Sequence, residues 1–147
     1  TLGGACHGKI IGFQSSELAI KLAGACQLEM ISVSAGNLKV EVSGASNLTG
    51  SIAYSGEGLF KVLGASRVVL QGTGNTARIE LAGASQAKFA NMALRNVALN
   101  CVGASSAQLK VSDNMDVQLV GASRLEYSGN PVIGRVQVAG ASVINHR

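Results

Sequence analysis

The stretch Leu38-Lys39-Val40-Glu41-Val42-Ser43-Gly44-Ala45-Ser46 decides the fold. Apolar and polar residues alternate until the tripeptide Gly-Ala-Ser, and a period of two is typical of a β-strand. The tripeptide recurs along the whole chain, with Cys in place of Ser in the first two copies. Its eight glycines are Gly4, Gly24, Gly44, Gly64, Gly83, Gly103, Gly121 and Gly140. Successive intervals of 20, 20, 20, 19, 20, 18 and 19 residues predict a solenoid.

A second apolar alternation follows most copies of the tripeptide, as at Leu28 and Met30, whereas the first coil has Gly8 where an aliphatic residue is expected. The next stretch is rich in turn-forming residues, as in residues 34–37 (Ser-Ala-Gly-Asn), and predicts an irregular segment or a short strand. Equivalent strands of successive coils can pair only in parallel, about 4.8 Å apart. The sequence therefore predicts one all-β domain over residues 1–147, a parallel β-helix with coils of about 20 residues. Parallel crossovers favour right-handed coiling, and eight corners at this spacing predict a rod roughly 35 Å long.

The Gly-Ala-Ser tripeptide is predicted to form the corner between two sheets, where Gly supplies unusual backbone angles and Ala and Ser occupy little space. The hydroxyls at the third position can bond one another or the corner amides. No base accompanies them, so a structural ladder is expected rather than a reactive site. The bend interrupts the alternation and leaves open whether Ala or Ser points inward. The expected ladder comprises Gly24, Ala25, Cys26, Gly44, Ala45, Ser46, Gly64, Ala65, Ser66, Gly83, Ala84, Ser85, Gly103, Ala104, Ser105, Gly121, Ala122 and Ser123.

The three cysteines divide into a stacked pair and a single residue. Cys6 and Cys26 occupy the same column one coil apart, which places their Cα atoms about 4.8 Å apart, within the range that a disulfide accepts. A bridge would close a loop of about 20 residues and add about 3 kcal/mol near the first coil. Side chains stacked in register on parallel strands are not ideally placed for the torsion about a disulfide bond. The sequence therefore leaves two alternatives, a Cys6–Cys26 disulfide or two free thiols. Cys101 falls at an inward aliphatic position and is predicted to be a small buried apolar residue.

Composition excludes several classes of protein. The chain is 47% apolar but only 14% charged and 3% aromatic, which excludes disorder and requires an aliphatic core. A net charge of +4, with signs that alternate along the column Lys21, Glu41, Lys61 and Glu80, does not resemble a nucleic-acid footprint. No run of about 18 apolar residues predicts a membrane span. The start at Thr1 rather than Met is expected of a processed chain or a fragment.

Catalytic and metal-binding motifs are missing from the sequence. Residues 72–77 fit the dinucleotide pattern G-x-G-x-x-A, but the pattern must open a helix and here a strand follows. The nucleophile elbow, paired metal-ligand histidines and the C-x-x-C motif do not occur. Coils of 18 to 20 residues leave no long loops to build a catalytic cleft. The sequence therefore predicts a protein that is not an enzyme and binds no cofactor or metal.

The repeat resembles the auto-transporter adhesin head GIN domain family (DUF2807). The resemblance rests on Gly-Ala-Ser set between alternating aliphatic residues, as at residues 42–48 and 81–85, and it spans nearly the whole chain. It implies a right-handed β-helix, mostly in bacterial proteins exported to the periplasm or the cell surface. It implies no catalytic residues.

Three functions follow from these expectations. We favour a non-enzymatic extracellular, periplasmic or cell-surface structural or adhesive module, because neither end of the repeat shows a cap and uncovered strand edges promote association. We expect such a module to associate end to end with other copies into filaments. A cell-surface polymer is a second expected partner. The alternative is a glycan- or lipid-binding module with an apolar strip of Ile11, Phe13, Ile31 and Val33 near the second corner. An enzyme on one face of the solenoid is the third.

Overall fold

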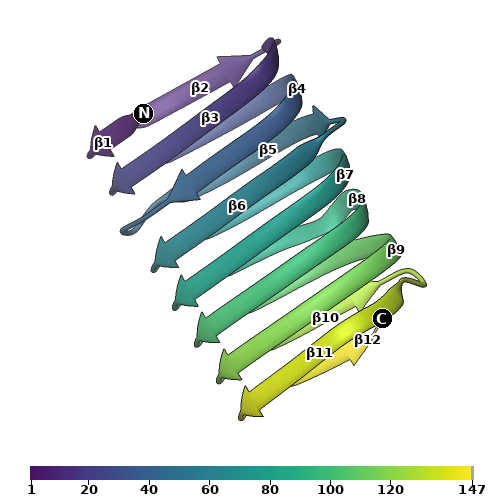
Figure 1. The fold of residues 1–147 in the computed structure, drawn as a ribbon. Coiled ribbons are helices and arrows are strands. Elements are labelled where there is room, and N and C mark those ends of the chain that lie inside the picture. Colours follow the sequence, from purple (N-terminus) through teal and green to yellow (C-terminus); the bar gives the residue numbers. More distant parts are fainter. Residues whose placement is uncertain (147) are drawn as a thin grey trace.

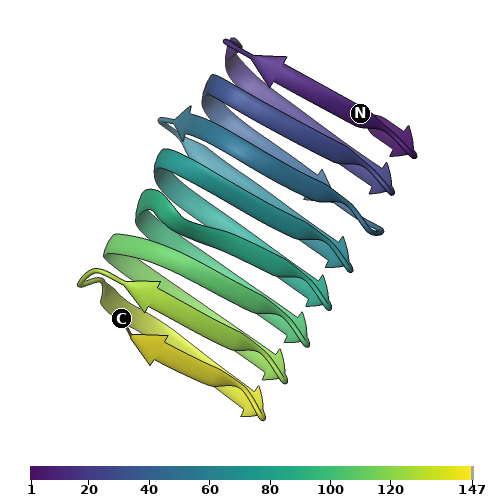
Figure 2. The same cartoon turned by 180° about the vertical axis from the view of Figure 1, so that it is seen from behind.

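The computed structural model describes residues 1–146 and contains strands but no helix. The chain winds into a right-handed β-solenoid of about seven turns, with its two termini at opposite ends of the rod (Figure 1). Figure 2 shows the same stack from behind. The strands are β1 (Leu2–Gly4), β2 (His7–Ile11), β3 (Gln14–Gly24), β4 (Gln27–Val42), β5 (Asn47–Tyr54), β6 (Glu57–Gly64), β7 (Arg67–Gly83), β8 (Gln86–Gly103), β9 (Ser106–Gly121), β10 (Arg124–Ser128), β11 (Val132–Gly140) and β12 (Val143–His146).

Parallel pairing between successive coils holds the rod together, and it confirms the predicted β-helix. The alternating apolar residues before each corner stack into continuous inward columns. In one column Ile20 pairs with Val40, Val40 with Phe60, and Phe60 with Ile79. All four side chains are buried. Because the period along each strand is two, the residues between them point outward and form polar columns on the surface.

The third side is a continuous strand in the coils of β4, β7, β8 and β9, as one alternative expected, and it is irregular at residues 55–56 and 129–131, as the other expected. Residues 34–37 lie inside β4, with Ala35 buried. The long strands bend around the core rather than break, so one strand covers more than one side of the rod (Figure 1). The bend within β4 falls at Ser32, whose φ of 54° is left-handed, and the equivalent bend in the first coil uses Gly12 at 62°.

Bulges absorb the differences in coil length. Between β8 and β9 the pairing shifts from Phe89 opposite Leu109 to Ala93 opposite Lys110, so that β8 contains extra residues at the bend. Pairing is then restored before the corner, where Gly103 lies opposite Gly121. An 18-residue coil can therefore follow a 20-residue coil without displacing the corner, because the slack is taken up at the bulge.

The core is aliphatic except for one aromatic cluster in its middle. Phe60 lies 5.2 Å from Phe89 and 6.1 Å from Tyr54, measured between ring centroids. Room for the Tyr54 ring comes from two glycines, since a Cβ at Gly58 or at Gly74 would overlap the ring. Small residues therefore stand beside large ones in neighbouring coils, which keeps the interior filled.

Candidate functional site

From Gly24 onward, the corner glycines pack closely against the preceding coil. Each has a positive φ, such as 84° at Gly83 and 93° at Gly103. A Cβ placed on Gly83 would lie 2.8 Å from the carbonyl oxygen of Gly64 in the preceding coil. Both the left-handed backbone and the close approach of the preceding coil therefore require glycine.

The serines of the corner point inward and the alanines outward, which settles the orientation that the sequence left open. Ser46, Ser66, Ser85, Ser105 and Ser123 are the buried polar residues of the described chain. Ser46 Oγ is typical, because it lies 3.0 Å from both the Gly24 and the Ser43 carbonyl oxygens. The ladder thus joins hydroxyls to carbonyls of its own and the preceding coil, rather than to one another. Corner amides reach hydroxyls at two places, Cys26 N to Ser46 Oγ and Ser123 N to Ser142 Oγ.

Cys6, Cys26 and Cys101 are free thiols in the structure. Cys6 and Cys26 stack one coil apart, as expected, because Gly4 pairs with Gly24 just before them. The Cys26 thiol donates to the Gly4 and Ala23 carbonyls at 3.4 and 3.2 Å, which are the bonds that serine makes in later coils. The thiol of Cys6 donates to the Gly3 carbonyl at 2.8 Å. Formation of a bridge between Cys6 and Cys26 on oxidation stays a prediction.

The coil at the C-terminal end of the described residues leaves its inward columns uncovered. Val136 and Val138 in β11 pair with Val117 and Leu119, which are 2% and 0% exposed. Because no further coil covers them in the described chain, Val136 and Val138 are each 46% exposed. At the other end Leu2, Ile10 and Leu18 are only partly buried against the core. Both ends thus present unpaired strand edges flanked by apolar side chains.

The apolar strip expected near the second corner is only partly present. Ile11 and Phe13 are exposed, at 65% and 42%, and Ile31 is half-buried. Val33 is 2% exposed, so its prediction as a strip residue is wrong. The bend at Ser32 shifts the alternation by one residue and turns Val33 into the core. What remains is two exposed residues in the first coil rather than a strip.

The predicted charge column is in register along one outward face. Lys21 pairs with Glu41, Glu41 with Lys61, and Lys61 with Glu80. Within residues 1–146 no ion pair joins neighbours along this column. Glu41 instead pairs with Lys39 on its own strand (3.8 Å), and Arg95 pairs with Asp113 (3.4 Å). The column therefore contributes to register through longer-range attraction, and each such pair is worth little at the surface.

A polar hollow lies on the outward face of β7, β8 and β9, and the sequence analysis missed it. Its floor is Ala98, which pairs with Arg78 on β7 and with Asp116 on β9. The hollow measures about 690 Å³ and continues to Gly134 and Arg135. The sequence does contain a signal for it, because Ala98 is a small residue at a position where the two neighbouring coils carry the charged residues Arg78 and Asp116. The outward residues that surround Ala98 are Thr76, Arg78, Glu80, Asn96, Asn100, Asn114, Asp116 and Gln118.

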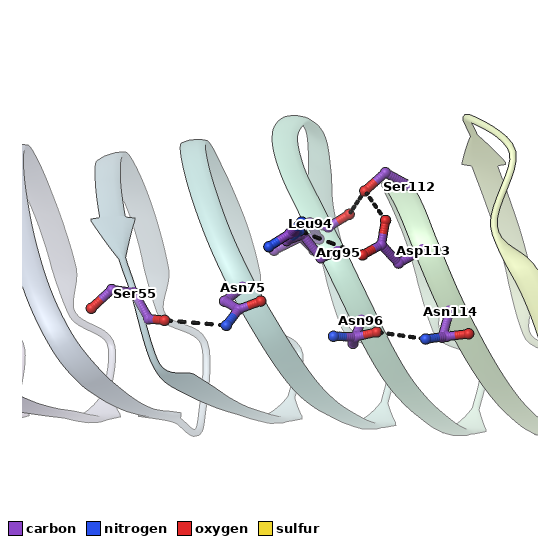
Figure 3. A network of polar contacts seen from close by, with 8 residues as sticks. All are labelled: Ser55, Asn75, Leu94, Arg95, Asn96, Ser112, Asp113 and Asn114. Carbon is purple, nitrogen blue, oxygen red and sulfur yellow. Dashed lines mark hydrogen bonds and ion pairs between the residues drawn. The ribbon is translucent and has the colours of Figure 1, made fainter.

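Beside the hollow, β8 and β9 are cross-linked by side chains (Figure 3). Asn114 Nδ2 donates to Asn96 Oδ1 at 2.9 Å. Ser112 donates to the Leu94 carbonyl at 3.3 Å, and Arg95 pairs with Asp113. These contacts fix one rim of the hollow.

Other kinds of site do not occur in the part of the chain that the structure describes. Across residues 1–146, no group of three or more His, Cys, Asp or Glu side chains is placed to hold a metal ion. Nor is any helix in that range long and apolar enough to cross a membrane.

The fold and its surfaces define a β-solenoid with a structural corner ladder, a polar hollow over β7, β8 and β9, and, within residues 1–146, inward columns that are uncovered at both ends. The chain belongs to the family described as "Putative auto-transporter adhesin, head GIN domain", whose model matches residues 14–131. Neither a curated protein nor a solved structure matches the chain. The family description names an adhesin head and no enzyme, so family and fold together fit a structural or adhesive role at the cell surface.

Proposed function

We propose that this chain is a non-enzymatic structural or adhesive module of an exported bacterial protein, exposed outside the cell or in the periplasm, and that it associates end to end. Its family and its solenoid fold support the surface role. The uncovered core columns of the C-terminal coil carry the proposal of self-association, because exposed apolar strand edges promote pairing with another chain. Val136 and Val138 are the side chains concerned.

The two ends are complementary in register. A second copy that extends the columns would place its Leu2 over Val138 and its Gly4 over Gly140, as Leu2 and Gly4 already lie over Leu22 and Gly24 within one copy. Inward apolar residues would then meet and the corner ladder would continue. Such a contact joins different surfaces of the two copies, so it produces open filaments rather than closed rings.

Analytical ultracentrifugation and negative-stain electron microscopy over a concentration series test this proposal. We expect filaments with an axial repeat of about 35 to 40 Å, the length of the rod at the spacing of β-strands. Val138→Asp should abolish assembly because it places a charge at the contact. The matched control is Val102→Asp, since Val102 is also exposed but lies on β8, away from both ends. A wild-type chain that stays monomeric at every concentration, or equal loss in both variants, would overturn the proposal.

A further inference from the structure

The side chains around Ala98 are arranged in rows by the register of three parallel strands. Three outward residues of β7 stand opposite three of β8, and these stand opposite three of β9. Strands lie about 4.8 Å apart and outward residues along one strand about 6.6 Å apart, so the eight side chains around Ala98 enclose about 10 by 13 Å. The alanine methyl leaves the centre low and apolar, with polar groups on every side.

Most hydrogen-bonding groups of this ring are unused. The side chains of Arg78, Glu80, Asn100 and Gln118 make no hydrogen bond or ion pair with any other residue within 1–146. Asn100 Oδ1 is moreover shielded from solvent without a partner. A buried acceptor without a donor is costly, so a ligand hydroxyl gains free energy if the Asn100 side chain turns toward the hollow and this oxygen accepts from it.

Other members of the ring are held in place before any ligand arrives. Asp116 Oδ1 accepts a hydrogen bond from the Arg135 backbone amide at 2.9 Å. The amide side chains of Asn96 and Asn114 bond to each other at 2.9 Å (Figure 3). An amide has further donor and acceptor positions beyond one bond, and a carboxylate has a second oxygen. The fixed side chains therefore still have groups to offer, at a reduced cost in side-chain entropy.

Charge indicates what kind of ligand fits. Arg78 and Arg135 carry two positive charges, and Glu80 and Asp116 carry two negative charges, so the lining is neutral overall. A polyanion or a polycation would meet as much repulsion as attraction. A neutral polyol suits the ring, because each hydroxyl both donates and accepts, and carboxylate, amide and guanidinium groups can each contact two neighbouring hydroxyls.

We propose that the hollow on β7, β8 and β9 binds a neutral sugar residue of a glycan. The pyranose ring lies over the Ala98 methyl, with its hydroxyls bonded to Arg78, Asn100 and Asp116. The site lies on the side of the rod, so it does not depend on end-to-end association. It gives an adhesive module a contact for a cell-surface polymer while the ends remain available to other copies.

Binding of defined oligosaccharides to the whole 147-residue chain tests the proposal. The probes are neutral trisaccharides of glucose, mannose, galactose and N-acetylglucosamine, printed beside a heparin tetrasaccharide and an oligonucleotide. Hits are then measured in solution by ¹H–¹⁵N NMR titration. We expect at least one neutral trisaccharide to bind, with amide shifts clustered around Ala98, and we expect neither anionic probe to bind at that site.

Two matched variants locate the site. Ala98→Gln fills the hollow without adding charge, and we expect it to weaken binding at least tenfold. Ala19→Gln makes the same change at the equivalent outward position of β3, also exposed and five residues before a corner glycine, and should bind like the wild type. The circular dichroism and sedimentation of both variants should match the wild type, which separates this result from failure of end-to-end association.

Three results would overturn the proposal. The first is that no neutral trisaccharide binds. The second is that binding is confined to the anionic probes, and the third is that folded Ala98→Gln binds as tightly as the wild type.

Discussion

At the scale of single residues, the corner serines explain how a polar column survives inside an aliphatic core. Ser85 Oγ lies 2.9 Å from the Ala82 carbonyl oxygen and 3.1 Å from that of Gly64 in the preceding coil. One hydroxyl thereby contacts acceptors on two levels of the rod at the bend. The serine side chain therefore points inward, toward these two carbonyl oxygens. An alanine in its place would leave both buried acceptors with fewer hydrogen-bond donors.

Ser85→Ala is expected to lower the free energy of unfolding by about 1 kcal/mol, because the hydroxyl bonds are lost while Gly64 O retains the Ala84 amide at 3.0 Å. Ser85→Cys should cost less, since Cys26 makes the same kind of contact in its own coil. The measurement is urea denaturation followed by circular dichroism. Ala84→Ser, at the exposed neighbouring position, is the control and should change stability by less than about 0.5 kcal/mol. Equal stability of Ser85→Ala and wild type would contradict a stabilising ladder.

The three thiols should differ sharply in reactivity. Burial raises the pKa of Cys101 to about 12, so at pH 8.5 almost none of it is thiolate, the reactive form. Iodoacetamide at pH 8.5 should therefore modify half-buried Cys6 first and leave buried Cys26 and Cys101 unmodified until the protein unfolds. Peptide mass mapping of native and urea-treated samples measures this order. Modification of Cys101 as fast as Cys6 in the native protein would contradict the buried position.

Oxidised protein gives the second thiol measurement. A Cys6–Cys26 bridge would appear in a non-reducing peptide map and vanish on reduction. Recovery of both residues as free thiols from fully oxidised material would exclude the bridge.

At the scale of strands, stacking decides which residue each coil tolerates. Tyr54 on β5 fills space that Gly74 on β7 leaves open, and neither residue can be understood from its own coil. The Tyr54 hydroxyl is buried without a partner among residues 1–146, and burial raises its pKa above the ordinary value. The ring therefore stabilises the core by packing, while its hydroxyl opposes burial.

Tyr54→Phe should raise the free energy of unfolding by about 1 kcal/mol, because it removes a polar group that folding strips of water. Gly74→Ala should destabilise the protein, since the added methyl overlaps the Tyr54 ring. Chemical denaturation of both variants measures the two opposite shifts. Tyr127→Phe, at a half-exposed site, should change stability by less than about 0.5 kcal/mol. A Tyr54→Phe variant less stable than wild type would mean that the hydroxyl has a partner.

Strands and corners were the predictable part of this fold, because the spacing of Gly-Ala-Ser and the period of two are local signals. The burial of Val33 was not predictable, since the bend at Ser32 shifts the alternation through a backbone angle that serine rarely adopts. The hollow could have been found, because Arg78, Ala98 and Asp116 each lie five residues before a corner glycine. The hollow becomes visible only when residues are aligned between coils by counting back from the corner glycines. Counting forward from the preceding corner fails, because the bulges between β8 and β9 change the spacing.

At the scale of the whole molecule, each coil touches only its neighbours, so stability is nearly a sum of stacked units. The middle coils are covered on both sides, whereas β11 is exposed along its whole length. Opening should therefore begin at the ends and move inward.

Hydrogen–deuterium exchange should show this gradient. We expect the amides of β11 and β12 to exchange fastest and those of β7 and β8 slowest, at a protein concentration where the chain is monomeric. Mass spectrometry of peptic peptides measures the rates. At a concentration where copies associate, protection at both ends should rise while the middle is unchanged. Uniform exchange along the rod would show that it opens as one cooperative unit instead.

The hydrogen bonds between coils run along the rod, and this direction has a mechanical consequence. Tension applied at the two termini loads the hydrogen bonds of an end coil first. These bonds therefore break coil by coil rather than all together. Every coil that peels away releases about 20 residues, or about 65 Å of extended chain. A surface attachment built from this rod would lengthen in steps of similar size under load, and each step would dissipate energy before the next coil bears the force.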